Sequence, residues 1–215
     1  MELIICEKPI LYSDAIKEMQ SIVEKISLGV SKDMLWTLEH HPIYTAGYTT
    51  YSSWINKYGS EIDGIPLVET GRGGQITYHG PGQRVIYFMI NLKKRYGQID
   101  LRKFLNDIHQ LIIDVLAEFG VIGIKDPQYP GVWVRDGTKL NKIAAIGIRV
   151  SKGVSYHGIA VNINPDLRFF NLIEPCGISD NDRGVTSLTA ILGRKVALSE
   201  FDHHLLSHID KMFKR

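Results

Sequence analysis

The sequence predicts an α+β fold in which helices flank a mixed β-sheet. Three observations favour it: three segments have helical periodicity, strand-like segments do not alternate regularly with helices, and two glycine-containing turns join neighbouring strands. The chain has 215 residues, of which 44% are hydrophobic and 22% charged. These values are typical of a globular protein and predict a single domain over residues 1–215.

The helical segments carry apolar residues at spacings of three and four. The first covers residues 13–27, and Ser13 is its expected N-cap. The second and strongest covers residues 101–119, with Asp100 placed to cap its start and Gly120 to end it. The third runs from about residue 199 to 213.

Six segments have the β-branched, aromatic or alternating pattern of strands. They are residues 34–38, 65–69, 84–92, 132–135, 142–150 and 154–164. Turn signals at residues 135–137 and 151–153 predict hairpins, the second of which joins the last two strands.

Charge, cysteine content and hydropathy argue against several classes of protein. A formal net charge of +2 is small for a strong nucleic-acid binder. Two cysteines, Cys6 and Cys176, are too few for a disulfide framework or a thiolate zinc site. No apolar run is long enough to span a membrane, and no secretory signal is visible. We therefore expect a cytoplasmic protein with reduced thiols.

Glycine is concentrated in one segment, GRGGQITYHGPG at residues 71–82, which holds five of the 20 glycines. Such a segment permits close backbone approach and can present several N–H groups to an anion or a carbonyl oxygen. It lacks the Lys-Ser/Thr of a Walker A loop, and Ile76 occupies the place of the third glycine of a dinucleotide fingerprint. A tight turn between strands is the alternative, but the density of polar side chains favours a ligand site.

The two cysteines lie in different settings. Cys6 follows an apolar, strand-like run, so a small packing role is expected. Cys176 lies between Pro175 and Gly177 in a segment without periodicity, where a thiol can be a nucleophile or incidental.

A thiol has a pKa near about 8.5 and needs a base to react at neutral pH. The candidates are His79, His157 and Lys142. Strand alternation would place Lys142 on the face of Ala144, Ile146 and Ile148, either as a strand-end residue reaching solvent or as a desolvated amine able to accept a proton. His157 is equally compatible with a core histidine.

Adjacent histidines do not point to a metal. The pairs His40–His41 and His203–His204 have diverging side chains, and no His-Glu-x-x-His pattern occurs, so no metal site is expected.

Taken together, these segments resemble the lipoyl(octanoyl) transferase family. Residues 72–83 look like its signature, and the segments 41–47, 142–147, 157–162 and 175–177 are similar to further family blocks in the same order. The matched blocks run from about residue 36 to 188. One departure is Ala46, where a larger apolar residue is commoner and could alter a wall of the acyl pocket.

The resemblance implies a biotin/lipoate protein ligase-like fold and transfer of an octanoyl group from acyl carrier protein to a lysine of a lipoyl-carrier domain. This is the first step of endogenous protein lipoylation. The acceptors implied are lipoyl-carrier domains of 2-oxoacid dehydrogenases and the glycine cleavage H protein. No cofactor, nucleic acid or membrane is implied.

The resemblance also assigns roles to residues. Cys176 is the implied acyl-thioester nucleophile and Lys142 the residue that lowers its pKa. The implied substrate-binding residues are Arg72, Gly73, Gly74, Gln75, Ile76, Thr77, Tyr78, His79, Ala145, Ile146, Gly147, Gly158, Ile159 and Ala160.

The implied chemistry is consistent. Exchange of an acyl group between thiols is nearly balanced in energy, and attack by a lysine amine to give an amide is downhill, so ATP is not required. Lys142 could take the Cys176 proton and return it to the leaving thiol. Backbone N–H groups near Gly147 or in the glycine-rich segment are candidates for stabilising the oxyanion.

Three alternatives remain open. The first is an ATP-dependent lipoate–protein ligase of the same fold, against which the presence of Cys176 and the apparent lack of an extra C-terminal domain argue. The second is an amidotransferase that moves octanoyl between carrier proteins, and the third is a non-catalytic acyl-carrier-binding module. The basic clusters 93–95 and 102–103 could meet an acidic carrier protein, or be ordinary solvated surface.

Overall fold

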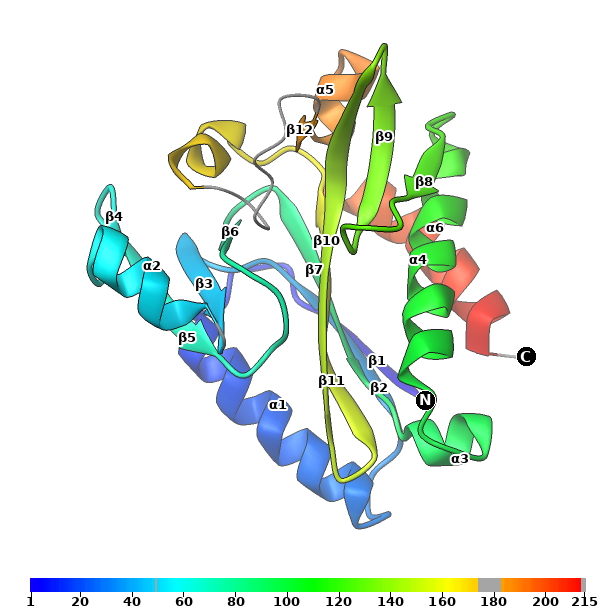
Figure 1. Cartoon of the computed structure of the whole chain (residues 1–215). Helices are drawn as coiled ribbons and strands as arrows, with labels where there is room; N and C mark the ends of the chain where they lie inside the picture. The colour runs from blue at the N-terminus through cyan, green and yellow to red at the C-terminus, as the bar shows by residue number, and fades with distance from the viewer. Residues whose placement is uncertain (49, 174–182, 214–215) are drawn as a thin grey trace.

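The computed structural model describes residues 1–48, 50–173 and 183–213. A large mixed sheet forms the centre, and helices cover both of its faces (Figure 1). The large sheet has the strand order β1-β2-β7-β11-β10-β9-β8, and β12 also pairs with β10. Its strands are β1 (Glu2–Ile5), β2 (Met34–Leu38), β7 (Gln83–Met89), β8 (Gly123–Lys125), β9 (Val132–Asp136), β10 (Lys139–Ser151), β11 (Val154–Asn162) and β12 (Arg183–Val185).

Most neighbours in the large sheet are antiparallel. The exceptions are the β1–β2 and β10–β12 pairs, which are parallel. The hairpin β10–β11 forms the centre of the sheet, and its turn is made by Lys152 and Gly153, with φ of 51° and 79°. Two successive residues in the left-handed region match the right-handed twist of the strands that they connect.

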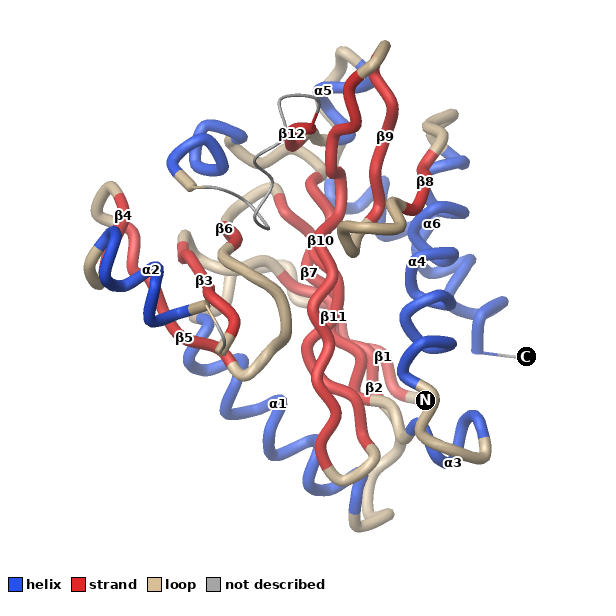
Figure 2. Tube along the Cα trace, viewed as in Figure 1, coloured by secondary structure: helices blue, strands red, loops and turns tan. Residues whose placement is uncertain are grey.

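A smaller sheet lies beside the large one, with the order β4-β5-β3-β6 (Figure 2). Its strands are β3 (Ile43–Gly47), β4 (Glu61–Ile62), β5 (Ile65–Thr70) and β6 (Thr77–His79). The helix α2 (Tyr51–Tyr58) and the 3-10 helix η1 (Leu167–Leu172) contribute Trp54 and Phe170 to its apolar core. The glycine-rich segment therefore runs from the end of β5 through β6.

Two helical layers bury opposite faces of the large sheet. The helix α1 (Tyr12–Ser27) packs with Trp36, Val85 and Tyr87 on one face. The helices α4 (Leu101–Glu118) and α6 (Leu198–Phe213) pack with Ile86 and Phe88 on the other. Because neighbouring residues of β7 face opposite ways, one strand supplies both cores. The short helices are α3 (Leu92–Tyr96) and α5 (Leu188–Leu192).

The predicted α+β class and both predicted hairpins are confirmed. Asp100 caps α4 by accepting a hydrogen bond from the Lys103 N–H, and Gly120, with φ of 71°, follows its end. The Ser13 cap was wrong: α1 begins at Tyr12, and Leu11 holds the N-cap position without a side-chain hydrogen bond. The strand predicted over 84–92 stops at Met89 because Asn91 caps α3.

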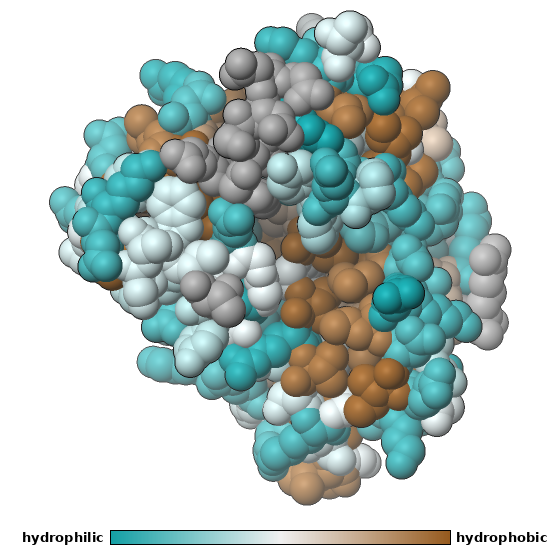
Figure 3. Space-filling view, in the orientation of Figure 1, coloured by the Kyte–Doolittle hydropathy of each residue, from teal (hydrophilic) through white to brown (hydrophobic). Residues whose placement is uncertain are grey.

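Part of the α4-side face is not fully covered. Ile146, Ile148 and Val150 of β10 are only partly buried against this core, and Figure 3 shows apolar surface along the hairpin beside α4. Within the part of the chain that the structure describes, none of the helices has the length and apolar character needed to cross a membrane.

Candidate active site

A small cavity lies between the glycine-rich segment and the hairpin β10–β11, on the α1-side face of the large sheet. Its volume is about 50 Å³. A larger hollow of about 620 Å³ adjoins it and shares Tyr12 and His157 with it. The cavity is lined by Tyr12, Arg72, Gly74, Gln75, Thr77, His79, Val85, Tyr87, Ala145, Ile146, Gly147, His157, Gly158, Ile159 and Ala160.

Eleven of the predicted substrate-binding residues meet at this cavity, although they come from three separate parts of the sequence. They are Arg72, Gly74, Gln75, Thr77, His79, Ala145, Ile146, Gly147, Gly158, Ile159 and Ala160. Ile76 and Tyr78 do not line it, because their side chains pack in the core of the smaller sheet. Gly73 also lies outside the lining, but its carbonyl oxygen would be 3.3 Å from a Cβ built at Gly147.

The glycine-rich segment is fixed against the smaller sheet by close backbone approach. A Cβ at Gly47 would lie 1.9 Å from the Gly74 carbonyl oxygen, so β3 requires glycine there. Arg72 Nη2 donates to the Thr45 carbonyl oxygen at 2.7 Å and to its hydroxyl at 2.8 Å. The guanidinium also donates to the Gly73 carbonyl oxygen at 3.0 Å. These contacts order the segment and place a positive charge at the cavity.

Two buried histidines in the neutral form, His79 and His157, line the cavity, and the ring of a third, His40, lies 5.9 Å from that of His79. Desolvation by burial lowers the pKa of His79 and His157 to about 3 and that of His40 to about 4. Gln83 donates through Nε2 to Asn162, so its Oε1 accepts and His79 carries its proton on Nδ1, at 2.6 Å. His157 has φ of 61° inside β11, a conformation that is costly for a residue with a side chain.

These histidines predict a loss of stability in acid. Their folded-state pKa values lie below the unfolded value of about 6.5, so the unfolded chain binds more protons and the free energy of unfolding falls as the pH drops below about 6.5. Each histidine contributes a slope of up to about 1.4 kcal/mol per pH unit. Urea unfolding of His79→Gln at several pH values should show a shallower decline. The exposed His203→Gln is the control, and equal slopes for wild type and His79→Gln would contradict the assignment.

Lys142 lies on the cavity face of the sheet. The expectation from strand alternation, that it shares a face with Ala144, Ile146 and Ile148, was wrong. The register between β10 and β9 shifts between Lys142 and Ala144: Lys142 pairs with Trp133, and Ala144 with Val132. Two steps on β10 therefore match one step on β9, as in a β-bulge. Ala144 faces the α4-side core with Val132, whereas Lys142 shares the opposite face with Trp133. The bulge thus places Lys142 on the same face as Ala145 and Gly147.

The Lys142 side chain is desolvated rather than strand-end surface. The residue is 3% exposed, and Nζ lies 4.8 Å from the centroid of the Trp133 ring. Its carbonyl oxygen accepts a hydrogen bond from the Thr186 N–H at 3.0 Å, just after β12. The amine is therefore held away from water against an aromatic ring.

Cys176, the other predicted catalytic residue, lies outside the described residues, so its pairing with Lys142 stays a prediction. Cys6 is half-buried, packs beside the α1-side core and accepts a hydrogen bond from Trp36 Nε1 at 3.1 Å. In the described part of the chain, no three His, Cys, Asp or Glu side chains form a metal-binding group. Ala46 is buried in the smaller-sheet core and does not line the cavity.

Sequence reasoning missed Tyr12, Val85 and Tyr87 as lining residues. Val85 and Tyr87 alternate on β7 with the α4-side residues Ile86 and Phe88. The sequence therefore indicates that they share a face, but not that this face lines a cavity. Tyr12 belongs to the first turn of α1, and no local pattern marks it.

The fold is shared with solved structures of lipoate and biotin protein ligases. The lipoate protein ligase of Thermoplasma acidophilum superposes with a TM-score of 0.69 at 16% identity, covering 99% of this chain and 83% of that chain. The biotin protein ligase of Aquifex aeolicus gives a TM-score of 0.53 at 16% identity, covering 100% and 69%. The predicted biotin/lipoate protein ligase-like fold is therefore confirmed.

Sequence similarity is more specific than the fold. Residues 12–210 match the family described as lipoyl protein ligase A/B catalytic domain, and the chain belongs to this family. The octanoyltransferase of Anaplasma phagocytophilum (strain HZ) is 43% identical over 203 residues, covering 94% of this chain and 93% of the relative.

Proposed function

We propose that this chain transfers an octanoyl group from acyl carrier protein to a lysine of a lipoyl-carrier domain through a thioester on Cys176. The enzyme is an octanoyltransferase, an acyltransferase of protein lipoylation, as its family and its curated relatives support. The observation that carries the proposed mechanism is the desolvated amine of Lys142 on the cavity face of β10.

The first half-reaction forms the Cys176 thioester. The Cys176 sulfur attacks the donor's acyl carbon as its proton passes to the Lys142 amine. Collapse of the tetrahedral intermediate breaks the bond to the carrier's pantetheine sulfur, which leaves with the proton from Lys142. Backbone N–H groups near Gly147 are candidates to stabilise the oxyanion.

The second half-reaction forms an amide. The neutral amine of the acceptor lysine attacks the thioester carbon and loses a proton to Lys142, and the Cys176 sulfur leaves. Apart from Arg72, the residues that line the cavity are uncharged, with His79 and His157 in the neutral form, and this lining suits an aliphatic chain.

The path of the described chain supports the pairing of Cys176 with Lys142. The residue before the undescribed segment, Ile173, is buried in the core of the smaller sheet. The chain is described again at Arg183, where β12 pairs with β10 up to Lys142 itself. The residues that follow the undescribed segment thus lie beside the proposed proton acceptor.

The acceptors that we propose are lipoyl-carrier domains, including those of 2-oxoacid dehydrogenases and the glycine cleavage H protein. The basic clusters lie elsewhere: Lys94, Arg95 and Lys103 border a hollow between α3, α4 and α6. Asp107 and Asp114 border the same hollow, so its charge is mixed. A role for these clusters in carrier docking remains a proposal.

A mass spectrum tests the proposed function. Incubation with octanoyl-acyl carrier protein, without ATP, should add one octanoyl mass to Cys176, and a lipoyl-domain acceptor should then remove it. Cys176→Ser should abolish or greatly weaken this labelling, while Cys6→Ser, which changes the other thiol, should retain it. Transfer that occurs only with ATP would support the ligase alternative. Absence of both labelling and transfer would favour a non-catalytic carrier-binding module.

A further inference from the structure

The Lys142 amine packs against the ring of Trp133. Among the residues that the structure describes, no carboxylate forms an ion pair with Lys142, and Nζ lies over the indole ring. Trp133 is fully buried, so its ring offers a fixed surface to the ammonium. The contacts that hold the indole therefore bear on the place of the amine.

The indole is held by the loop that precedes β9. Trp133 Nε1 donates to the Tyr129 carbonyl oxygen at 3.0 Å, and the two rings lie 6.3 Å apart. Gly131 in the same loop leaves room for the lysine, since a Cβ there would lie 3.3 Å from Lys142 Cε and 2.4 Å from the Ala144 carbonyl oxygen.

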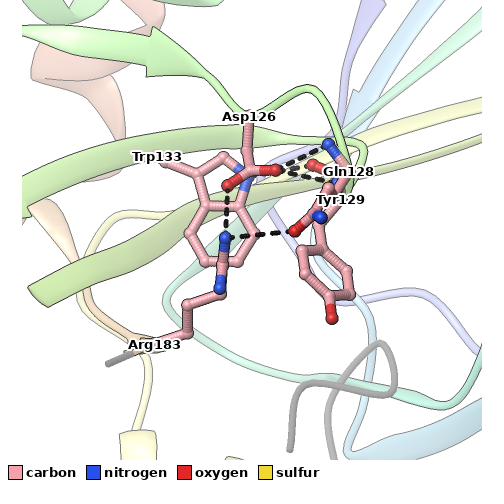
Figure 4. A network of polar contacts seen from close by, with 5 residues as sticks. All are labelled: Asp126, Gln128, Tyr129, Trp133 and Arg183. Carbon is pink, nitrogen blue, oxygen red and sulfur yellow. Dashed lines mark hydrogen bonds and ion pairs between the residues drawn. The ribbon is translucent and has the colours of Figure 1, made fainter. Parts of the chain in front are cut away.

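Asp126 and Arg183 organise this loop (Figure 4). Asp126 Oδ1 accepts hydrogen bonds from the backbone N–H groups of Gln128 and Tyr129, at 2.7 and 3.0 Å. Its Oδ2 pairs with Arg183 Nη2 at 3.1 Å, and the guanidinium carbon lies 4.9 Å from the centroid of the Tyr129 ring. The exposed fractions of the two side chains are 3% for Asp126 and 14% for Arg183, so the pair is shielded from water.

Asp126 stays ionised in this setting. Burial alone would raise the pKa of its carboxyl, but the two backbone N–H groups and the Arg183 guanidinium outweigh burial and bring the pKa below its ordinary value.

The Asp126–Arg183 ion pair is also connected to the backbone of Lys142, through β12. Arg183 opens β12, which runs parallel to β10 with Val185 opposite Lys142. The Thr186 N–H then donates to the Lys142 carbonyl oxygen. The ion pair is therefore linked to the lysine side chain through Tyr129 and Trp133, and to the lysine backbone through β12.

We propose that Asp126 and Arg183 are positioning residues that set the place of the Lys142 amine through Tyr129 and Trp133. They lie outside the cavity lining and act on proton transfer rather than on substrate binding. This inference rests on the proposed role of Lys142 as proton acceptor.

Single-turnover acylation of Cys176 tests the proposal across a pH range in Asp126→Asn, Arg183→Lys and Trp133→Phe. Asparagine keeps the size but not the charge, lysine keeps the charge but not the planar stack, and phenylalanine keeps an aromatic face but not the indole N–H. Displacing the amine by a fraction of an ångström to about 1 Å should lower the rate about 10- to 100-fold. The rate should rise at a higher pH than in wild type, with the donor KM changed by less than about twofold.

Controls separate positioning from folding. Glu200→Gln removes a partly exposed ion pair with Arg194 (2.7 Å) and should leave the rate and pH profile unchanged. Combining Asp126→Asn with Lys142→Met should give no further loss beyond Lys142→Met alone, because both changes remove the same function. If Asp126→Asn fails to fold, Trp133→Phe and Arg183→Lys decide the question.

A wild-type rate and pH profile in the folded variants would overturn the proposal, as would a raised KM with an unchanged turnover rate. Normal acylation in Lys142→Met would instead overturn the role of Lys142 as proton acceptor, on which this inference rests, and would leave octanoyl transfer through Cys176 standing. Slow acylation in Lys142→Met together with wild-type behaviour in the positioning variants would reject the positioning role alone.

Discussion

Replacing Lys142 by alanine should slow acylation of Cys176 at neutral pH by about 100- to 10,000-fold, the range typical of losing a positioned general base. A thiol with a pKa near about 8.5 is mostly protonated at neutral pH, so attack needs an acceptor for its proton. At higher pH the thiolate forms without help, and the defect should shrink. Rapid-quench mass spectrometry of the acyl-enzyme measures both effects.

Two further substitutions identify which property of Lys142 matters. Lys142→Met keeps the length of the buried stem, so it should remain folded and be as slow as alanine. Lys142→Arg keeps the charge but cannot release a proton, so it should be slow if proton transfer limits the rate. Recovery of the rate in Lys142→Arg would show that charge alone suffices, and a normal burst in Lys142→Met would exclude the Cys176–Lys142 pair.

Replacing Gly158 by alanine should destabilise the whole chain and distort the cavity that this glycine lines. The new Cβ would lie 1.8 Å from the Ile86 carbonyl oxygen and 3.1 Å from Tyr87 Cα, and both are backbone atoms of the central strand β7. Strands β7 and β11 would have to separate, and overpacking in a core costs about 1–3 kcal/mol or more. For a chain of this length, each kcal/mol lowers Tm by about 2–4 °C.

Gly73→Ala is the matched control for stability. A Cβ at Gly73 would meet nothing within 4 Å, so the same chemical change should leave Tm almost unaffected. Thermal unfolding followed by circular dichroism compares the two variants. A Gly158→Ala variant as stable as wild type would contradict the close approach of β11 to β7.

The long helices and the central hairpin were predictable from sequence because their signals are local. The periodicity of α4 extends over 18 residues, and the turn at residues 151–153 can be identified from its glycine. The smaller sheet was mostly missed: β4 and β6 have two and three residues, too short for a pattern of alternation. In addition, β6 pairs with β3, which lies far before it in the sequence, so no local pattern indicates the pairing.

Some residues of the site could likewise be predicted from the sequence, and others could not. The glycine-rich segment and the two core strands could be assigned by resemblance, and the structure brings most of those residues to one cavity. The face of Lys142 could not be predicted, because alternation assumes a regular strand and a bulge interrupts β10. Asp126 and Arg183 lie 57 residues apart, and neither lies in a segment with a recognisable motif.

The bulge in β10 has a consequence for the placement of Lys142. The bulge interrupts the alternation of side chains along β10, so that two successive residues, Ile143 and Ala144, both face the α4-side core. In a strand of the same length without the bulge, regular alternation would place Lys142 on the face of Ala144 and Ile146, toward the apolar core and away from the cavity. The extra residue in β10, and not the type of the residue alone, therefore determines the face of the sheet on which the lysine lies.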